Sequence, residues 1–548
     1  MEIINDKKVK NKFNNLLDQV QKKHLQPEDS FEVAAILESL GWNDDRAYNE
    51  FGVYNVFELS NQLWESIKTK INIIPHSTKE NHSILKLSFD SFRNFIRGFI
   101  FALPMAISVI SMLNLKFSLW SYENLTTDLA TSIALSTILS FMTIGGFTQA
   151  IARRGFFFIS QNYYTHAKKN TYLFLKIGYV LALIISILFF LLNSFFQYFT
   201  FKMVTTTIVF YFFMCSIWLA VTVMYILRKE LIFTGLLIFG ILMVYIQVRL
   251  FGYEQIIRSQ IISLFIVSIL SITIVILIFN KEEKKSDVTI SSQKFKSSVA
   301  IYSTIPYFIY GFSYFTFLFA DRIVAWSTNN LDYMPYLIWF RGRYELGLDF
   351  ALLMLIIPMG FIEVIITNFV NELEVCQKDF NSTQIDLMYK KFKLSYIKRF
   401  IVVMIISIIS ATIVFFATDI FDKVFYTNNN SESLIHNPTT MFVFITALIS
   451  YSILVLGLMN SLLLFTISQP HIVTKSLIYS LVINIILGFL LSRWMTAIIY
   501  NYNITNLPAG YSFSILGLLA GCITFLVLTF RSILKVLSKI DYYIYYMS

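Results

Sequence analysis

The sequence has little charge. Charged residues make up only 14% of the chain and hydrophobic residues 56%, and the mean hydropathy is +0.63. Soluble domains carry about 25% charged residues, so this composition excludes an ordinary soluble protein and predicts a chain built for lipid. The net charge of +10 does not indicate a nucleic-acid partner, because no basic block with stacking aromatics lies outside the apolar runs.

Cysteine and recognisable catalytic patterns are also scarce. The three cysteines, Cys215, Cys376 and Cys522, are isolated, so neither a disulfide framework nor a metal-ligand spacing is present. The sequence contains no serine nucleophile elbow, phosphate loop or metal-binding His/Glu pattern. We therefore expect no metal, no cofactor and no enzyme activity. The first 70 or so residues are polar and charged rather than a signal peptide, which predicts a cytoplasmic N-terminus.

What the chain has in abundance is apolar runs long enough to cross about 30 Å of hydrocarbon. These runs predict an all-α polytopic membrane protein with about twelve transmembrane helices. They cover approximately residues 92–113, 126–150, 171–196, 202–227, 230–251, 256–279, 299–320, 346–370, 397–418, 440–467, 472–498 and 511–532.

A charged segment at 281–296 divides the twelve runs six and six, as a joint between two halves of a two-repeat transporter would. The expected organisation is a helical bundle at 1–75, a linker at 76–90, a first six-helix half at 91–280, a cytoplasmic linker at 281–296, a second six-helix half at 297–540 and a C-terminal tail at 541–548.

Lysine and arginine placement predicts the orientation, because basic residues accumulate in cytoplasmic loops. We expect a protein of the cytoplasmic (cell) membrane with both termini on its cytoplasmic side. The residues assigned to that side include Arg153, Arg154, Lys168, Lys169, Arg228, Lys229, the five lysines of 281–296, Lys378, Lys390, Lys391, Lys393, Lys398, Arg399, Arg531, Lys535 and Lys539.

The N-terminal 75 residues predict a small cytoplasmic bundle. A charged helix at Lys7 to Lys23 is followed by a capping sequence at 27–30 and by three short helices with apolar faces at helical spacing. These three helices resemble ubiquitin-associated-type bundles. We interpret the bundle as an appendage for docking or assembly. The partner that it would bind is a cytoplasmic synthase subunit.

Three acidic residues lie inside or at the edge of the eighth run. A charge at membrane depth costs roughly 2.5 to 3.5 kcal/mol on insertion scales, so such residues usually face a bundle interior or a wet cavity. On one continuous helix Glu345, Asp349 and Glu363 would share nearly one face. One reading is an ion-coupling pathway, with Glu363 the better candidate because its own helix offers no basic residue within two turns.

The alternative reading of these acids is an ion-paired cluster. In it, Arg341 and Arg343 neutralise Glu345 and Asp349, and Arg322 pairs with its neighbour Asp321. The candidate residues for a substrate or ion pathway are Asp321, Arg322, Glu345, Asp349 and Glu363.

Glycines and arginines mark two further places. Gly145 and Gly146 either unwind a helix beside a substrate path or allow close helix packing through small residues. Arginines near the ends of the first two runs either snorkel to the membrane surface or contact lipid headgroups. The candidates for headgroup contact are Arg93, Arg97, Arg153 and Arg154.

The chain resembles the multidrug/oligosaccharidyl-lipid/polysaccharide (MOP) flippase superfamily. The resemblance rests on the two six-helix halves, on the segment from Gly145 to Ala150 with Arg153 and Arg154, and on the segment from Tyr307 to Arg322. Within it, the chain is most similar to PelG-type exopolysaccharide exporters. The resemblance covers roughly residues 90–540 and excludes the N-terminal bundle. It implies transport by alternating access, driven by an ion gradient. The implied substrate is an envelope polysaccharide or a lipid-linked glycan, and the protein would contact membrane lipid. A cation-coupled multidrug exporter and a non-transporting scaffold for a glycan synthase remain the alternatives.

Overall fold

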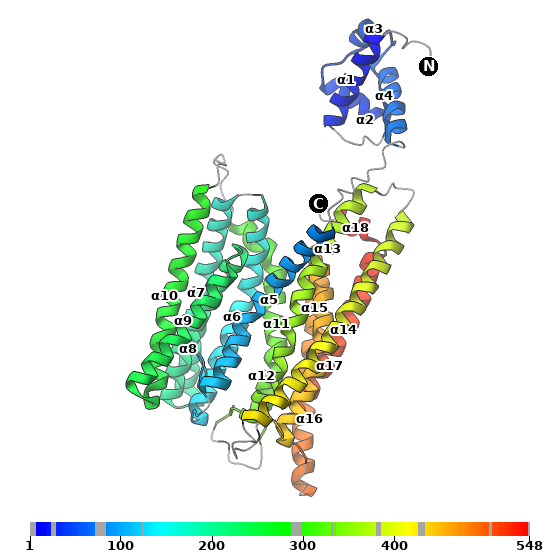
Figure 1. The fold of residues 1–548 in the computed structure, drawn as a ribbon. Helices are drawn as coiled ribbons and strands as arrows, with labels where there is room; N and C mark the ends of the chain where they lie inside the picture. Colours follow the sequence, from blue (N-terminus) through cyan, green and yellow to red (C-terminus); the bar gives the residue numbers. More distant parts are fainter. Residues whose placement is uncertain are drawn as a thin grey trace. The chain divides into compact units, whose positions relative to one another are not determined.

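The computed structural model describes residues 7–23, 29–71, 84–122, 124–161, 163–285, 297–329, 334, 336–379, 385–425, 433, 435–502 and 507–545 (Figure 1). The chain divides into two compact units, Met1–Phe89 and Asp90–Ser548. Helices make up nearly all of the described residues, and no strand occurs among them, which confirms the all-α expectation.

The first unit contains α1 (Lys7–Lys23), α2 (Ser30–Ser39), α3 (Asp44–Phe51) and α4 (Val56–Ile71). Side chains cap two of these helices, because the Asp29 carboxylate accepts from the Glu32 amide at 2.8 Å and Asn43 accepts from the Arg46 amide at 3.0 Å. Fifteen buried apolar residues, including Leu17, form a core of the unit's own. The predicted helices and the predicted cap are confirmed.

An ion pair on this unit gives it a pH-dependent stability. Arg46 donates from Nε to Glu50 at 3.0 Å, and this bond lowers the pKa of Glu50 from its ordinary 4.5. A carboxylate with a lowered folded-state pKa stabilises the fold above its unfolded pKa, and the contribution disappears as the pH falls through the folded value. We therefore expect Glu50→Gln to flatten the acid limb of unfolding of residues 1–75, measured by circular dichroism below pH 5 or so. An unchanged acid limb would contradict this prediction.

The second unit carries the membrane spans. Eleven of its described helical segments are long and apolar enough to cross a membrane, and α5, which contains the first predicted run, is not among the eleven. The helices are α5 (Ile84–Leu115), α6 (Thr127–Ser160), α7 (Tyr164–Phe196), α8 (Phe201–Ile226), α9 (Glu230–Phe251), α10 (Ile256–Lys285), α11 (Ser297–Trp326), α12 (Gly342–Leu352), α13 (Ile356–Asp379), α14 (Ile385–Phe425), α15 (Pro438–Thr466), α16 (Pro470–Tyr502), α17 (Ile515–Leu537) and α18 (Ile540–Tyr545), with short 3₁₀ turns η1 (Tyr253–Gln255), η2 (Leu353–Leu355) and η5 (Gly510–Ser514).

The spans pack around two hydrophobic cores. The first core draws its buried residues from the segment between Phe117 and Phe279, and the second draws nearly all of them from helices α11 to α18. The exception is Ile138 of α6, which belongs to the second core, while Phe308 of α11 packs against the first. Helices α6 and α11 therefore join the two halves, and they lie between the two groups of helices in Figure 1.

The α6–α11 contact is made through glycine. A Cβ at Gly311 would lie 2.1 Å from the backbone oxygen of Gly145, and a Cβ at Gly146 would lie 2.5 Å from the ring of Phe308. Helix α6 continues without a break through Gly145 and Gly146. Of the two readings of these glycines, the structure therefore supports close helix packing. We call this contact the α6–α11 seam.

The eighth predicted run is not one continuous helix. It consists of α12, the 3₁₀ turn η2 and α13. Pro358 explains the interruption, because it has no N–H to give to the carbonyl of Met354, four residues earlier. Ser410 of α14 satisfies that carbonyl instead, with its hydroxyl 2.6 Å from the oxygen.

Candidate functional site

A buried arginine of α11 holds two acidic side chains of α12. Arg322 donates from Nη1 to Glu345 and from Nη2 to Asp349, the second contact measuring 3.5 Å. Trp326, one turn further along α11, donates its indole N–H to the other oxygen of Glu345 at 2.9 Å. We refer to Arg322, Trp326, Glu345 and Asp349 as the Arg322 cluster.

Exposure differs sharply within the cluster. The side chains of Arg322 and Glu345 are 10% and 8% exposed, whereas that of Asp349 is 51% exposed. Since one guanidinium faces two carboxylates, the cluster carries a net negative charge when both acids are ionised. Such charge at membrane depth favours neutralisation by a proton or a cation. Asp349 is the acid that an incoming ion reaches without disturbing the buried Arg322–Glu345 pair.

The ion pairs differ from the predicted cluster. Arg341 does not neutralise Glu345; it donates to the backbone oxygen of Thr328 at 2.9 Å and lies over the ring of Tyr511 at 4.8 Å. Arg343 is exposed. The predicted partners were sequence neighbours, but Arg322 reaches across to α12 because its helix packs beside the start of that helix.

Asp321 has a different partner from the one predicted. Its Oδ2 accepts from the hydroxyl of Tyr344 at 2.7 Å, and that hydroxyl also accepts from Ser514 of η5 at 3.1 Å. Oδ1 of Asp321 is buried and has no hydrogen-bond partner among the described residues. This arrangement places a second buried carboxyl beside the Arg322 cluster, bonded to Tyr344 of α12 and through it linked to Ser514 of η5.

Aromatic rings connect the Arg322 cluster to the first half of the membrane unit. The guanidinium of Arg322 lies 5.4 Å from the ring of Phe319, which stacks on Phe141 of α6 at 5.6 Å. Phe141 packs in turn against Trp218 of α8, with ring centroids 4.4 Å apart. Sequence reasoning did not single out Phe141 or Phe319, because aromatics far apart in an aromatic-rich chain give no local signal. Trp218, at the end of the fourth predicted span, is predicted from sequence to be part of an interfacial aromatic belt.

Glu363 is not part of the Arg322 cluster. It lies on α13 against α5, where a Cβ added at Gly98 would be 3.1 Å from the Glu363 Cβ. The expectation of one acidic face fails because η2 changes the rotation per residue between Asp349 and Glu363. The structure thus brings together Asp321, Arg322, Glu345 and Asp349, and separates Glu363 from them.

The arginines at the end of α6 bond to the second half. Arg153 donates to the hydroxyl of Ser468 at 2.9 Å, and Arg154 donates from Nε to the hydroxyl of Ser303 at 3.0 Å. These bonds give both residues protein partners at the end of the seam where α11 begins. Arg93 is exposed on α5, and the side chain of Arg97 lies outside the described part of the structure.

No group of three or more His, Cys, Asp or Glu side chains in the described part of the chain is arranged to hold a metal ion. Among the ion pairs of the described residues, Arg322–Glu345 is the most deeply buried.

No protein-family model and no curated protein matches the chain by sequence. Solved structures do match. A mutant of the Vibrio cholerae MATE transporter VcmN is 11% identical with a TM-score of 0.52, covering 83% of this chain and 97% of that one. The outward-facing conformation of a multidrug resistance MATE family transporter of the MOP superfamily is 14% identical with a TM-score of 0.50, covering 81% and 96%. The chain is thus a polytopic all-α membrane protein with the fold seen in MATE transporters.

Proposed function

We propose that the protein is a secondary transporter or flippase that exports an envelope polysaccharide or a lipid-linked glycan by alternating access. The observation that carries the proposal is the α6–α11 seam: two helical halves with separate cores meet there through a glycine-mediated contact, beside a buried cluster of opposite charges. A seam of this kind lets two rigid halves rock against each other, as alternating access requires. The fold likeness to MATE transporters supports the same reading.

Ion coupling is the role we assign to the acidic residues. Asp349 is the exposed acid of the Arg322 cluster, and neutralising it weakens one of the two contacts that join Arg322 of α11 to α12. Glu363 lies on α13 where this helix packs against α5, and we propose that its ionisation affects the packing of these two helices. Both acids therefore link ion binding to helix movement, with the bound ion being a proton or sodium.

The glycan substrate rests on the likeness to PelG-type exporters and on the segments that carry it. A cation-coupled multidrug exporter would fit the same fold, and the second solved structure is itself described as a multidrug resistance transporter. The two functions differ in what crosses the bilayer. A non-transporting scaffold would carry nothing.

Transport by the purified full-length protein in liposomes separates these functions. A fluorescent lipid-linked glycan, a cationic drug and sodium are each supplied under an imposed proton or sodium gradient. Glycan movement that requires the gradient supports the proposal, and drug movement alone supports the multidrug alternative. If none of the three crosses under any gradient, the transporter proposal is wrong and the scaffold reading gains.

Substitutions that keep shape but remove ionisation test the coupling acids. We expect Asp349→Asn and Glu363→Gln each to reduce gradient-driven transport by about tenfold or more, because the coupling ion loses its ligand, and to flatten its pH dependence. Asp128→Asn, outside the cluster near the start of α6, is the control and should retain transport. Full activity with the original pH profile in Glu363→Gln would make Glu363 a packing residue.

The N-terminal bundle is proposed to dock a cytoplasmic partner such as a synthase subunit, with both termini on the cytoplasmic side. Because this unit has its own core, deleting residues 1–75 should leave an inserted, folded membrane unit that transports in liposomes. The deletion should reduce glycan export in cells, where the partner matters. Membrane accumulation measured by blotting provides the check, and its loss on deletion would show that the bundle is needed for folding of the spans.

A further inference from the structure

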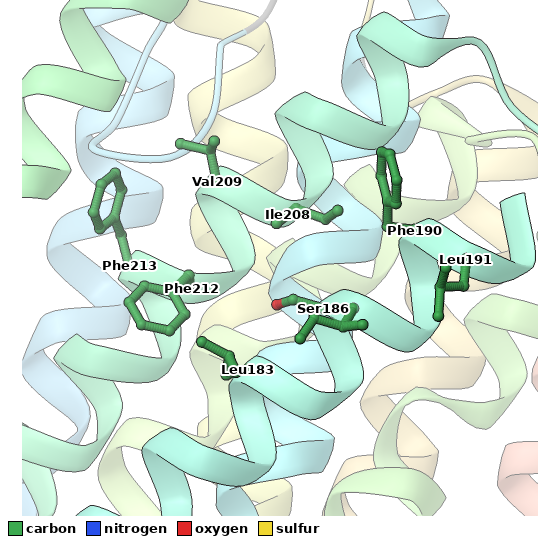
Figure 2. Close-up of a pocket in the computed structure, with 9 residues that line it drawn as sticks. Leu183, Ser186, Phe190, Leu191, Ile208, Val209, Phe212 and Phe213 are labelled. Carbon is green, nitrogen blue, oxygen red and sulfur yellow. The ribbon is translucent and has the colours of Figure 1, made fainter. Parts of the chain in front are cut away.

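Helices α7 and α8 leave an apolar groove on the membrane-spanning surface. It has a volume of about 410 Å³, and Figure 2 shows the facing side chains of the two helices around it. Ser186 is its one polar lining residue, and the Ser186 hydroxyl already donates to the Ala182 carbonyl at 2.9 Å. The lining residues are Leu183, Ser186, Ile187, Phe190, Leu191, Ile208, Val209, Phe212 and Phe213. We call this hollow the α7–α8 groove.

The setting of the groove points to a hydrocarbon chain as its occupant. Both helices are long and apolar enough to cross the membrane, and most of the surface of α7 faces outward. Leu183 and Ile187 are each 51% exposed, and Leu191 is 47% exposed. In a bilayer the available material at this depth is lipid tail, which is as apolar as leucine.

A second hollow, lined by both polar and apolar side chains, adjoins the groove where α7 ends and α8 begins. It has a volume of about 420 Å³, and Phe190 lines both hollows. Its lining includes Ser194, Gln197, Thr200 and Tyr336, and none of the described residues that line it carries a carboxylate. We call this hollow the polar end pocket.

The shape of the polar end pocket is fixed by the chain itself. The Asn193 side chain donates to the Phe199 carbonyl at 2.9 Å and accepts from the Phe199 amide at 2.8 Å, which closes the turn between the two helices. Tyr336 comes from the segment between α11 and α12, and its ring lies 5.9 Å from that of Phe199. The pocket is therefore built from both halves of the membrane unit.

We propose that these two hollows bind one membrane glycerophospholipid, with an acyl chain in the α7–α8 groove and the phosphate and glycerol region in the polar end pocket. An apolar cavity at membrane depth that opens into a hydroxyl- and amide-lined pocket near the helix ends matches an amphiphile with one end of each kind. Each hollow falls within the size range of small-molecule sites, which is about 300–1,000 Å³. Because Tyr336 belongs to the second half, the bound lipid contacts both halves and stabilises the arrangement that brings Phe199 and Tyr336 together.

Photolabelling of the full-length protein tests the site. The protein is placed in nanodiscs of phosphatidylethanolamine and phosphatidylglycerol containing a phosphatidylglycerol with a diazirine on its acyl chain, and labelled peptides are identified by mass spectrometry. We expect labelling of residues 183–213 to exceed that of the outward-facing residues of α10 by about tenfold, equivalent to about 1.4 kcal/mol of preferential binding.

Filling the groove should abolish this preference. Ser186→Trp places an indole in the groove, and its matched control is Thr273→Trp on α10, where the hydroxyl likewise donates to the carbonyl four residues earlier, at 2.8 Å. Labelling should fall to the α10 level in Ser186→Trp and stay high in Thr273→Trp. Val209→Phe, from the opposite wall, should act like Ser186→Trp if the latter folds poorly.

Three results would overturn the proposal. Equal labelling of the groove and of α10 would show an ordinary lipid shell. Strong labelling that neither Ser186→Trp nor Val209→Phe reduces would place the lipid elsewhere on these helices. A photoreactive residue introduced at Ile187 that joins two copies of the chain, rather than forming a lipid adduct, would show that the groove is covered by a second protomer.

Discussion

Gly311→Ala should lower the unfolding temperature of the membrane unit by several degrees and sharply reduce transport. The added Cβ would lie 2.1 Å from the Gly145 oxygen and 2.8 Å from the Gly145 carbonyl carbon. Both are backbone atoms, so no side-chain rotation relieves the clash, and α6 and α11 must move apart. Overpacking in well-packed cores costs roughly 1–3 kcal/mol, and separating two helices along a seam places this change at the upper end.

The control for this substitution is Gly235→Ala on α9. A Cβ there meets no atom within 4 Å, and the position lies inside a membrane-spanning helix like that of Gly311. Since alanine is favoured over glycine in a helix by about 1 kcal/mol, this variant should unfold at the same temperature as the original chain or higher. Thermal unfolding in detergent micelles, followed by circular dichroism, measures both. An unfolding temperature for Gly311→Ala equal to that of Gly235→Ala would show that the α6–α11 seam is looser than its geometry indicates.

The sequence predicts those structural features whose signal lies within one short segment of the chain. Helical spacing of apolar residues and capping side chains predicted α1 to α4, and run length predicted the spans, because both signals lie within one segment. The break at η2 had a local signal as well: Pro358 deprives the Met354 carbonyl of its usual partner. Reading that proline would have separated Glu363 from Asp349 in advance.

The pairing of Arg322 could not be predicted in the same way. Its partner Glu345 is 23 residues further along the chain, and the choice between Glu345, Asp349 and the adjacent Asp321 depends on how α12 packs beside α11. The sequence from 321 to 349 holds four acids and three arginines, and composition alone does not decide which of them pair. The same applies to Gly311, whose contact with Gly145 joins residues from different halves.

The second large effect is expected at Arg322. Arg322→Gln leaves the buried Glu345 without its cation, and removing one partner of a buried ion pair typically costs about 3–5 kcal/mol. Trp326 still donates to Glu345, but one neutral hydrogen bond does not replace a guanidinium. The variant should accumulate poorly and unfold at a markedly lower temperature. Arg249→Gln on α9, where the exposed guanidinium contacts the Tyr245 hydroxyl, should leave the unfolding temperature unchanged.

A double substitution separates the structural role of the pair from its role in transport. Arg322→Gln with Glu345→Gln removes both buried charges and leaves two amides that can hydrogen-bond, so most of the lost stability should return. Transport should not return, because Asp349 then lacks the guanidinium that ties its ionisation to the position of α11. The measurements are the unfolding temperature and gradient-driven transport of the three variants in the same liposomes. If the double variant recovers transport together with stability, the Arg322–Glu345 pair only stabilises the fold, and ion coupling takes place at another acid.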